Sequence, residues 1–455
     1  MSNIAGNIVP FSLLVVIFVL APWLHGLDLV WEQLAVAGSA ILLISWLTLG
    51  ISTPQTQNEN RALLLWVLWL GYCAIYLLPL PASFITFLSP QTATWYATYA
   101  HDVRPYLTVY WQASLIEWIK MLGLGCLIFA LIHWLRRPQA IYVLMGILLF
   151  GAVLTALYSV VNYATEGAYE WVDAIPPWTF SWKNGIRGTF SYKNQYAVYM
   201  ALACLIAIGL LCDAKYLKIP QALVILLLLS LCLLGYTLLN TSSRGALASL
   251  IAGMGITLCM QVARSPNLLK RWLTGKTLVA AILISVMLGT GFAQSSIYKR
   301  FSKEKLDDNG RIELRDTAFS VFKDHPIVGT GLGTYPYIQH VYKTMLLGNT
   351  KMSKRAHNDY LETMATTGII GFGLLAVTLG FMWLLLFRHT HTRMNGALYA
   401  CRAGVMTYLI QASFDTNAGI YFLPILFVTL LTMGLIITER FDFKNPASRT
   451  DIQRL

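Results

Sequence analysis

One stretch decides the fold class of this protein: residues 355–388 read RAHNDYLETMATTGIIGFGLLAVTLGFMWLLLFR. It opens with a largely polar segment that includes His357, and an apolar run long enough to cross a bilayer begins near Gly368. The stretch therefore predicts an ionisable imidazole at a membrane surface. Histidine titrates near neutral pH and has charged neighbours here, so His357 is the first candidate for a catalytic base. A solvated histidine at the start of a helix fits the same residues.

Composition extends this interpretation to the whole chain. The protein has 455 residues, of which 56% are hydrophobic and 12% charged, with a mean hydropathy of +0.59. These values predict an all-α polytopic membrane protein, a single transmembrane domain over residues 1–455 with one long outward loop at 294–367. About twelve segments are apolar enough to be spans. They are residues 8–24, 32–50, 62–80, 115–135, 139–162, 193–212, 221–240, 246–263, 277–293, 368–388, 396–413 and 420–438.

Lysine and arginine predict the orientation. With both termini in the cytoplasm, the inner loops and tail hold fifteen Lys and Arg residues, whereas the short outer loops hold five. His357, Arg187 and Arg244 then face outward, which in a Gram-negative cell is the periplasm. The net charge of +12 follows from this topology and does not indicate nucleic-acid binding. The first span has no cleavage-site pattern and is expected to remain as an anchor.

Two outward turns carry arginines beside predicted spans. Arg187 and Lys193 flank Gly188 where a transmembrane helix starts, and helix amino termini favour anions. Arg244 lies in a turn of only a few residues and so at the membrane boundary, where a guanidinium needs an anionic partner or water. Charge that anchors the span, or snorkelling toward lipid headgroups, are the alternatives.

Other charged residues are weaker candidates. Lys120 shares a helix face with Glu117 at the mouth of a span, where it could contact phosphate or simply pair with the glutamate. Residues 309–323 predict an amphipathic helix in the long loop, with Arg311 and Arg315 one turn apart. These two arginines could bind a phosphate or a sugar acid, or form salt bridges with nearby carboxylates.

The sequence favours neither a nucleotide site nor a metal site. Residues 325–333, HPIVGTGLG, superficially resemble a nucleotide loop, but no strand precedes them and they face away from the cytoplasm. They are better explained as a turn over the membrane surface. The outward loops contain no HExxH motif and no carboxylate cluster, so no metal and no cofactor are expected.

Four motifs taken together resemble the O-antigen ligase superfamily. They are RGTF at 187–190 with KN at 193–194 before a span, SRG at 243–245 in a tight turn, Arg311 through HP at 325–326 with GTG at 329–331, and HNDYL at 357–361 followed by GIIG at 368–371. The resemblance is strongest over residues 180–375. Earlier spans match in hydropathy alone.

The resemblance implies a metal-independent, membrane-embedded glycosyltransferase that uses a glycan linked to undecaprenyl pyrophosphate as donor. By matching position, His357 would be the catalytic histidine, and Arg187 and Arg244 would bind the pyrophosphate. A base that acts opposite the leaving group would invert the anomeric centre. Further possible substrate contacts are Lys120, Lys193, Asn194, Arg311, Arg315 and Asn358.

The favoured function is that of an O-antigen ligase of the bacterial inner membrane, which transfers glycan to a sugar of lipid A–core in lipopolysaccharide biosynthesis. A polysaccharide polymerase of the same superfamily is the main alternative. A protein O-oligosaccharyltransferase is disfavoured by the short carboxyl tail. A transporter is disfavoured because the notable charges gather at the outer ends of the spans and not at the bilayer midplane. Membrane lipids are the other expected partners, whereas the oligomeric state, the sugar and the acceptor hydroxyl are not predicted.

Overall fold

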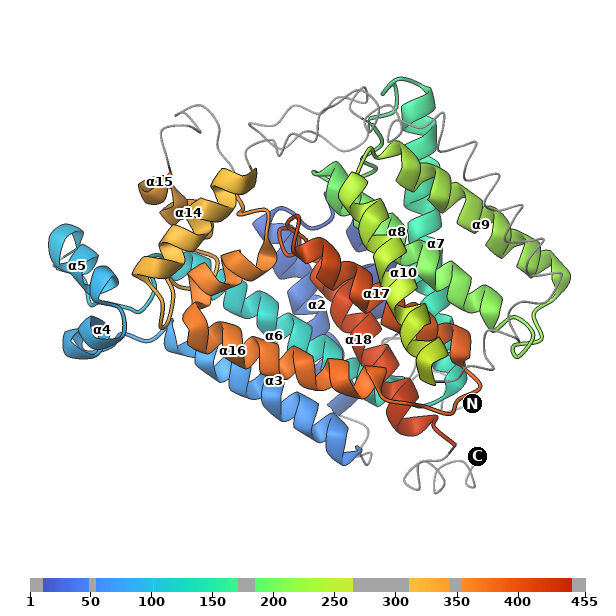
Figure 1. The fold of residues 1–455 in the computed structure, drawn as a ribbon, viewed down its shortest axis with the longest axis horizontal. Helices are drawn as coiled ribbons and strands as arrows, with labels where there is room; N and C mark the ends of the chain where they lie inside the picture. Colours follow the sequence, from blue (N-terminus) through green and yellow to red (C-terminus); the bar gives the residue numbers. More distant parts are fainter. Residues whose placement is uncertain are drawn as a thin grey trace.

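The computed structural model describes residues 11–48, 55–100, 102–170, 185–264, 311–343 and 354–443, and the regular structure within these ranges is helical (Figure 1). After an apolar helical segment at Phe11–Trp23, the helices are α2 (Val30–Thr48), α3 (Gln57–Ile75), α4 (Ala82–Leu88), α5 (Pro90–Tyr99), α6 (Trp111–Trp134), α7 (Pro138–Ala164), α8 (Lys193–Cys212), α9 (Gln221–Asn240), α10 (Arg244–Arg264), α14 (Arg311–Asp324), α15 (Tyr335–Tyr342), α16 (Asp359–Phe387), α17 (Asn395–Ala412) and α18 (Phe422–Arg440).

Seven of these helices are long and apolar enough to cross a membrane, namely α6, α7, α8, α9, α10, α16 and α18. The predicted all-helical polytopic membrane fold is therefore confirmed for the described ranges. Helices occupy eleven of the twelve predicted spans, and the remaining one, 277–293, lies outside the described residues. The count of twelve spans stays a prediction.

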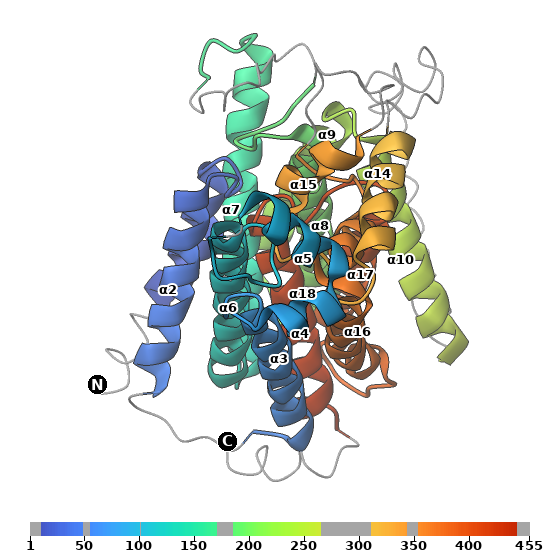
Figure 2. The same cartoon turned by 90° about the vertical axis from the view of Figure 1, so that its left-hand side faces the viewer.

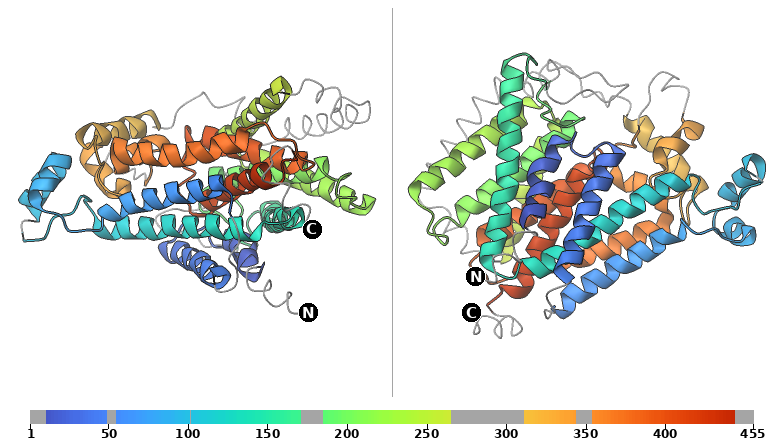
Figure 3. Two further views of the ribbon diagram at one scale, coloured as in Figure 1. Left: turned by 90° about the horizontal axis from the view of Figure 1, so that it is seen from below. Right: turned by 180° about the vertical axis from the view of Figure 1, so that it is seen from behind.

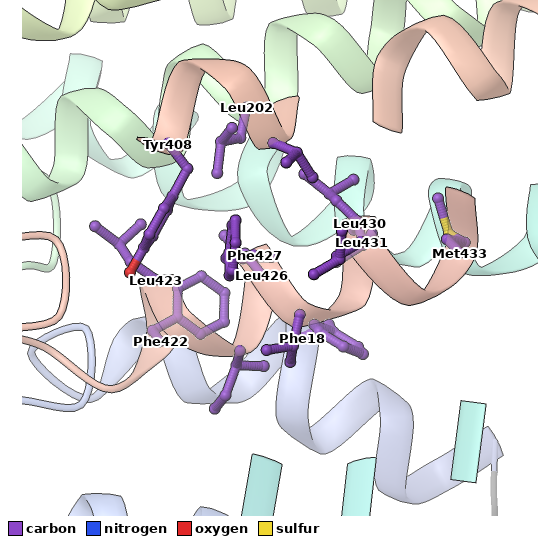
Figure 4. Packing of buried hydrophobic residues seen from close by; sticks show 14 of the residues in the cluster. Phe18, Leu202, Tyr408, Phe422, Leu423, Leu426, Phe427, Leu430, Leu431 and Met433 are labelled. Atoms are coloured by element: carbon purple, nitrogen blue, oxygen red, sulfur yellow. The ribbon is translucent and has the colours of Figure 1, made fainter. Parts of the chain in front are cut away.

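The core of the bundle forms around α18, which is almost completely buried, together with α8. Figure 4 shows α18 side chains meeting Phe18, Leu202 and Tyr408, and the rings of Tyr408 and Phe427 stack with centroids 4.5 Å apart. By contrast, α9, α10 and α16 expose many large apolar side chains on their outer faces. That distribution is expected of helices that face lipid around a central pair.

Polar contacts gather at the two opposite ends of the bundle. At one end Asp213, which follows α8, accepts hydrogen bonds from the N–H groups of Gly396 and Ala397 at the start of α17, at 2.8 Å each. At the same end Arg440 binds Glu59 with both Nε and Nη2. The starts of α8, α10 and α16 and the end of α17 therefore meet at the opposite end, called the upper end here, on which α14 lies (Figure 2).

Helix α16 is broken at Gly368, where φ is 64° and ψ is −174°. The segment 326–331 lies beside this break, and N–H groups of Thr330 and Gly331 donate to the carbonyls of Ala365 and Thr366, while Ile369 N–H donates to Pro326 O. The loop thus satisfies backbone groups that the break leaves unpaired. Thr330 and its neighbours are buried against α16, and a turn over the membrane surface at 325–333 stays a prediction.

Helices α4 and α5, which follow α3, extend sideways from the bundle, at the left of Figure 1 (Figures 1 and 3). Phe84 and Phe87 on α4 and Tyr99 on α5 are exposed. The pair is tied to the end of α14 through the buried His325, whose ring lies 5.1 Å from that of Trp95.

Candidate active site

His357 and Asp415 form a hydrogen-bonded pair at the upper end of the bundle. The Nδ1 atom of His357 lies 2.8 Å from Oδ1 of Asp415. The histidine precedes α16 and keeps 19% of its side chain exposed, whereas the aspartate, in the connection from α17 to α18, keeps 3%. A half-buried imidazole is therefore held by a buried carboxylate.

Three further groups fix the Asp415 carboxylate. Asn194 donates to Oδ2 at 2.6 Å, Arg311 donates to Oδ2 at 3.1 Å, and the N–H of Thr416 donates to Oδ1 at 2.9 Å. Burial alone would raise the pKa of Asp415, but the hydrogen bonds from His357 and Asn194 and the charge of Arg311 outweigh it and hold the pKa below its ordinary value. Asp415 is therefore an anion at neutral pH.

The anionic partner decides which nitrogen of His357 is basic. A carboxylate only accepts hydrogen bonds, so Nδ1 carries the proton that it donates to Asp415. In the neutral ring Nε2 then holds a lone pair, and it makes no hydrogen bond within the described residues. The imidazole can accept a proton at Nε2 while the aspartate stabilises the resulting charge.

The segment 355–360 clamps the connection that carries Asp415. Arg355 donates to Gly419 O at 3.3 Å, and Asn358 donates to Ser413 O at 3.1 Å. Asp359 accepts from the N–H groups of Asn417 and Ala418, and Tyr360 donates to Leu409 O. These side chains, like that of His357, thus contact the last turn of α17 or the connection from α17 to α18, which explains why polar residues are concentrated in this segment.

The backbone around His357 is also constrained. His357 has a φ of 52°, in the left-handed region that non-glycine residues seldom adopt. Glu362 supports this turn by accepting from the N–H of Ala356 at 2.9 Å and from Arg355 at 2.8 Å. Asn358 caps α16 by accepting from the N–H of Leu361. The surrounding bonds therefore hold a strained conformation that aims the imidazole at Asp415.

Arg187 lies in the connection that precedes α8. Its guanidinium donates to Oε1 of Glu170 at 2.7 Å and to the carbonyl of Phe190 at 2.9 Å. Burial lowers the pKa of Arg187 below its ordinary value and Glu170 opposes this shift, yet an arginine stays charged at any physiological pH. The carboxylate of Glu170 shows that an oxyanion can reach this guanidinium.

Arg244 is the first residue of α10, and its side chain is partly exposed. The turn before it is as short as predicted, with Ser242 in a left-handed conformation at a φ of 61°. The N–H of Ile186 donates to Asn240 O at 2.8 Å, so the turn that carries Arg187 contacts the turn that carries Arg244. The two predicted pyrophosphate ligands therefore lie at the same end of the bundle as His357.

The weaker candidates are distributed unevenly. Asn194 and Arg311 hold Asp415, and Asn358 caps α16, so each supports the site through other groups. Lys193 starts α8 beside Asn194. Arg315, one turn along α14, makes no hydrogen bond or ion pair within the described residues and has a buried, unpartnered Nε. The amphipathic helix predicted at 309–323 is confirmed as α14.

Lys120 lies apart from these residues. It is only 3% exposed and binds Oε1 of Glu117 at 2.6 Å, as the spacing of three residues predicts. It also lies over the ring of Tyr421, with Nζ 5.6 Å from the ring centroid. Its positive charge is therefore neutralised inside the bundle.

Sequence reasoning missed Asp415 and Glu170. Asp415 lies in the short connection between two predicted spans, and an ionisable residue at the end of a span is the signal in the sequence that could have identified it. Its role was hidden because its partner, His357, lies 58 positions earlier in the chain. Within the described ranges, no group of three or more His, Cys, Asp and Glu side chains could hold a metal ion.

Residues 227–376 match a family model described as O-antigen ligase. The match covers most of α9, then α10, α14, α15 and the first part of α16, and so includes Arg244, Arg311 and His357. It ends before Asp415 and begins after Arg187. No curated protein matches the chain.

Proposed function

The match supports membership of this chain in the O-antigen ligase superfamily, and from that premise we propose that the protein is a membrane-embedded O-antigen ligase. Its donor is a glycan on undecaprenyl pyrophosphate, and its acceptor is a sugar hydroxyl of lipid A–core. The observation that carries the proposal is the 2.8 Å bond between His357 Nδ1 and an anionic Asp415, which leaves Nε2 as a base.

The reaction needs a base and pre-placed positive charge. Nε2 of His357 takes the proton of the acceptor hydroxyl as its oxygen attacks the anomeric carbon, and Asp415 stabilises the imidazolium that forms. The bond from that carbon to the pyrophosphate oxygen breaks, and the electron pair leaves with the lipid pyrophosphate. Arg187 and Arg244 stabilise the departing anion. Attack opposite the leaving group inverts the anomeric centre.

The upper end of the bundle supplies further cations for an anionic donor. Arg315 has no partner within the described residues, and Lys193 stands at the amino terminus of α8, where unpaired N–H groups favour anions. Both are proposed as secondary contacts to the donor. Asn194, Arg311 and Asn358 are proposed as positioning residues, because their side chains hold Asp415 or its connection.

The proposed orientation has twelve spans, both termini in the cytoplasm and the upper end in the periplasm. Basic side chains at the lower end support it, since Arg264, Arg388 and Arg440 all lie there. The lipid tail of the donor then stays in the bilayer while its headgroup reaches His357.

Reconstitution tests the proposal. Full-length protein in proteoliposomes with undecaprenyl-pyrophosphate-linked glycan and lipid A–core should form glycosylated lipid A–core. His357→Ala should abolish transfer and retain donor binding, since the base is lost and the arginines remain. A well-folded His357→Ala protein that still transfers glycan would remove this histidine from the mechanism.

Chelation tests the chemistry separately. Because the proposed steps use a histidine base and arginines, EDTA should leave the rate of transfer unchanged. Activity that disappears with EDTA and returns with a divalent cation would contradict the metal-independent mechanism.

The polymerase is the second candidate, because the same donor, base and arginines serve it equally well. The ligase is preferred because the predicted outward chain is concentrated in one long loop, 294–367. That arrangement leaves a side open to a bulky membrane-anchored acceptor.

A further inference from the structure

A cavity lies between α3, α6, α16 and α18, which pack against one another in a ring. Its volume is about 100 Å³. Its lining includes Arg355 and Asp359, which lie two residues before and two residues after His357. The cavity therefore reaches residues two positions from the proposed catalytic base. Neither His357 nor the two proposed pyrophosphate ligands line it.

The cavity is lined by an unusual number of ionisable groups for a helical membrane bundle. Lys120 binds Glu117 at 2.6 Å, and Arg355 binds Glu362 at 2.8 Å. Asp359 is held by two backbone N–H groups, so only one of its oxygens is used. Placing charges within membrane helices is costly, and such groups are characteristic of functional sites.

A buried donor in this cavity has no acceptor. Trp69 on α3 lines the cavity and is 1% exposed. Its Nε1–H makes no hydrogen bond within the described residues. Two other tryptophans do have acceptors across the contact between α3 and α6, since Trp66 donates to Met121 O and Trp118 donates to Leu70 O. A buried unsatisfied donor costs about 1–3 kcal/mol, so an acceptor from a ligand is expected at Trp69.

The chemistry of the lining narrows the class of ligand. A phosphate would need uncompensated cations, but Lys120 and Arg355 already pair with carboxylates, and two of the three carboxylates are neutralised in the same way. A ligand that both donates to carboxylates and accepts from Trp69 fits this lining. Sugar hydroxyls do both.

We propose that this cavity is a subsite for the hydroxyl-bearing edge of one sugar residue of the substrate, held beside His357 by Trp69 and the surrounding carboxylates. The volume of about 100 Å³ is several times what a single water molecule needs. This inference rests on the proposed function. The sugar belongs either to the acceptor or to the donor, and the two give the same contacts.

Binding of lipid-free sugars tests the subsite without any transfer. Full-length protein in nanodiscs is titrated with delipidated core oligosaccharide in one arm and with glycan released from its carrier lipid in the other. One arm should show saturable binding, and Trp69→Phe should raise its Kd about fivefold, the loss expected for one neutral hydrogen bond. Trp118→Phe is the matched control, because it removes an indole N–H between the same two helices outside the cavity, and it should leave the Kd unchanged.

Kinetics separate a binding role from a structural one. Trp69→Phe should raise the KM of the matching substrate with kcat within about twofold, whereas a folding defect would lower kcat. If Trp69→Phe does not fold, Leu124→Phe fills the cavity from α6 and should weaken the same binding. If the Kd for sugar is the same in both variants as in the wild type, the sugar binds elsewhere and the inference is overturned. If no sugar binds in either arm, the cavity holds water only, and the inference is overturned as well. Transfer in proteoliposomes is measured independently, so it tests the proposed function whether or not the sugar subsite is confirmed.

Discussion

Asp415 fixes the tautomer of His357, so removing its charge should disable the proposed base. In Asp415→Asn the amide can present either a donor or an acceptor to Nδ1 and no longer stabilises an imidazolium. We expect kcat to fall at least ~100-fold, about 2.7 kcal/mol of transition-state stabilisation, with donor affinity nearly unchanged. Single-turnover transfer in proteoliposomes measures this. Asp316→Asn, on the exposed face of α14, is the charge-matched control, and equal activity of the two variants would contradict a role for the dyad.

The proposed contribution of Arg244 to transfer should depend on the shape of its side chain as well as on its charge. Lysine keeps the positive charge but loses the planar fork that binds two phosphate oxygens at once. We expect Arg244→Lys to lower kcat/KM at least tenfold, about 1.4 kcal/mol or more. The assay is transfer with varied donor concentration. Full activity in Arg244→Lys would mean that the side chain acts only as a charge or as an anchor.

His357, Arg187 and Arg244 could be selected from the sequence because each interrupts or borders a long apolar run, where a polar side chain is costly. Asp415 and Glu170 could not be selected in this way. Their importance depends on contacts across 58 positions with His357 and 17 positions with Arg187. Local patterns carry no information about which loops meet at one end of a bundle.

At the scale of elements, the break in α16 depends on glycine at position 368. A Cβ there would lie 2.3 Å from Ile327 O, and the φ of 64° is unfavourable for any L side chain. We expect Gly368→Ala to lower the free energy of unfolding by ~2 kcal/mol or more. Thermal unfolding in detergent is the measurement.

Gly373→Ala is the matched control in the same helix. A Cβ at Gly373 meets nothing within 4 Å, and alanine is the better helix former by about 1 kcal/mol. This variant should therefore be neutral or slightly more stable. If the two alanine variants have the same unfolding temperature, the break in α16 does not depend on glycine at position 368.

The contact between α5 and α14 should make stability depend on pH. Burial lowers the pKa of His325 from 6.5 to about 4, so between these values the unfolded chain binds a proton that the folded protein does not. Stability therefore falls as the pH drops from 6.5 toward 4, by ~3 kcal/mol over the window. Unfolding temperatures between pH 7.5 and 4.5 should follow this slope.

His325→Asn removes the titrating ring from this contact. Its unfolding temperature at pH 7.5 should be lower than that of the wild type, because the contacts to Ser89 and Trp95 weaken, but its decline toward acid should be flatter. His340→Asn, on the exposed side of α15, should keep the wild-type slope. An unchanged slope in His325→Asn would show that other groups cause the acid sensitivity.

At the scale of the whole molecule, hydropathy was sufficient to place almost every long helix, because lipid-facing and core-facing residues are equally apolar in a membrane. Because these two kinds of residue are equally apolar, hydropathy does not predict which helices are central and which face lipid. Nothing in residues 420–438 distinguishes the buried central helix α18 from α9, which exposes much of its surface. The pairing of 326–331 with the break in α16 was likewise hidden, since backbone hydrogen bonds leave little trace in side-chain pattern.

Ligase and polymerase share the donor and the site, so the acceptor decides between them. If the chain is a ligase, a deletion strain should make lipid A–core with no O-antigen, while long polymer accumulates on undecaprenyl pyrophosphate. A polymerase deletion should instead leave core that carries a single repeat unit, because ligation of the monomer continues. Lipopolysaccharide gels of the deletion strain, complemented with wild type or with His357→Ala, read out the difference. A core-plus-one-repeat band that only the wild type extends would replace the ligase with the polymerase, and the dyad, the arginines and the sugar subsite would then serve chain growth.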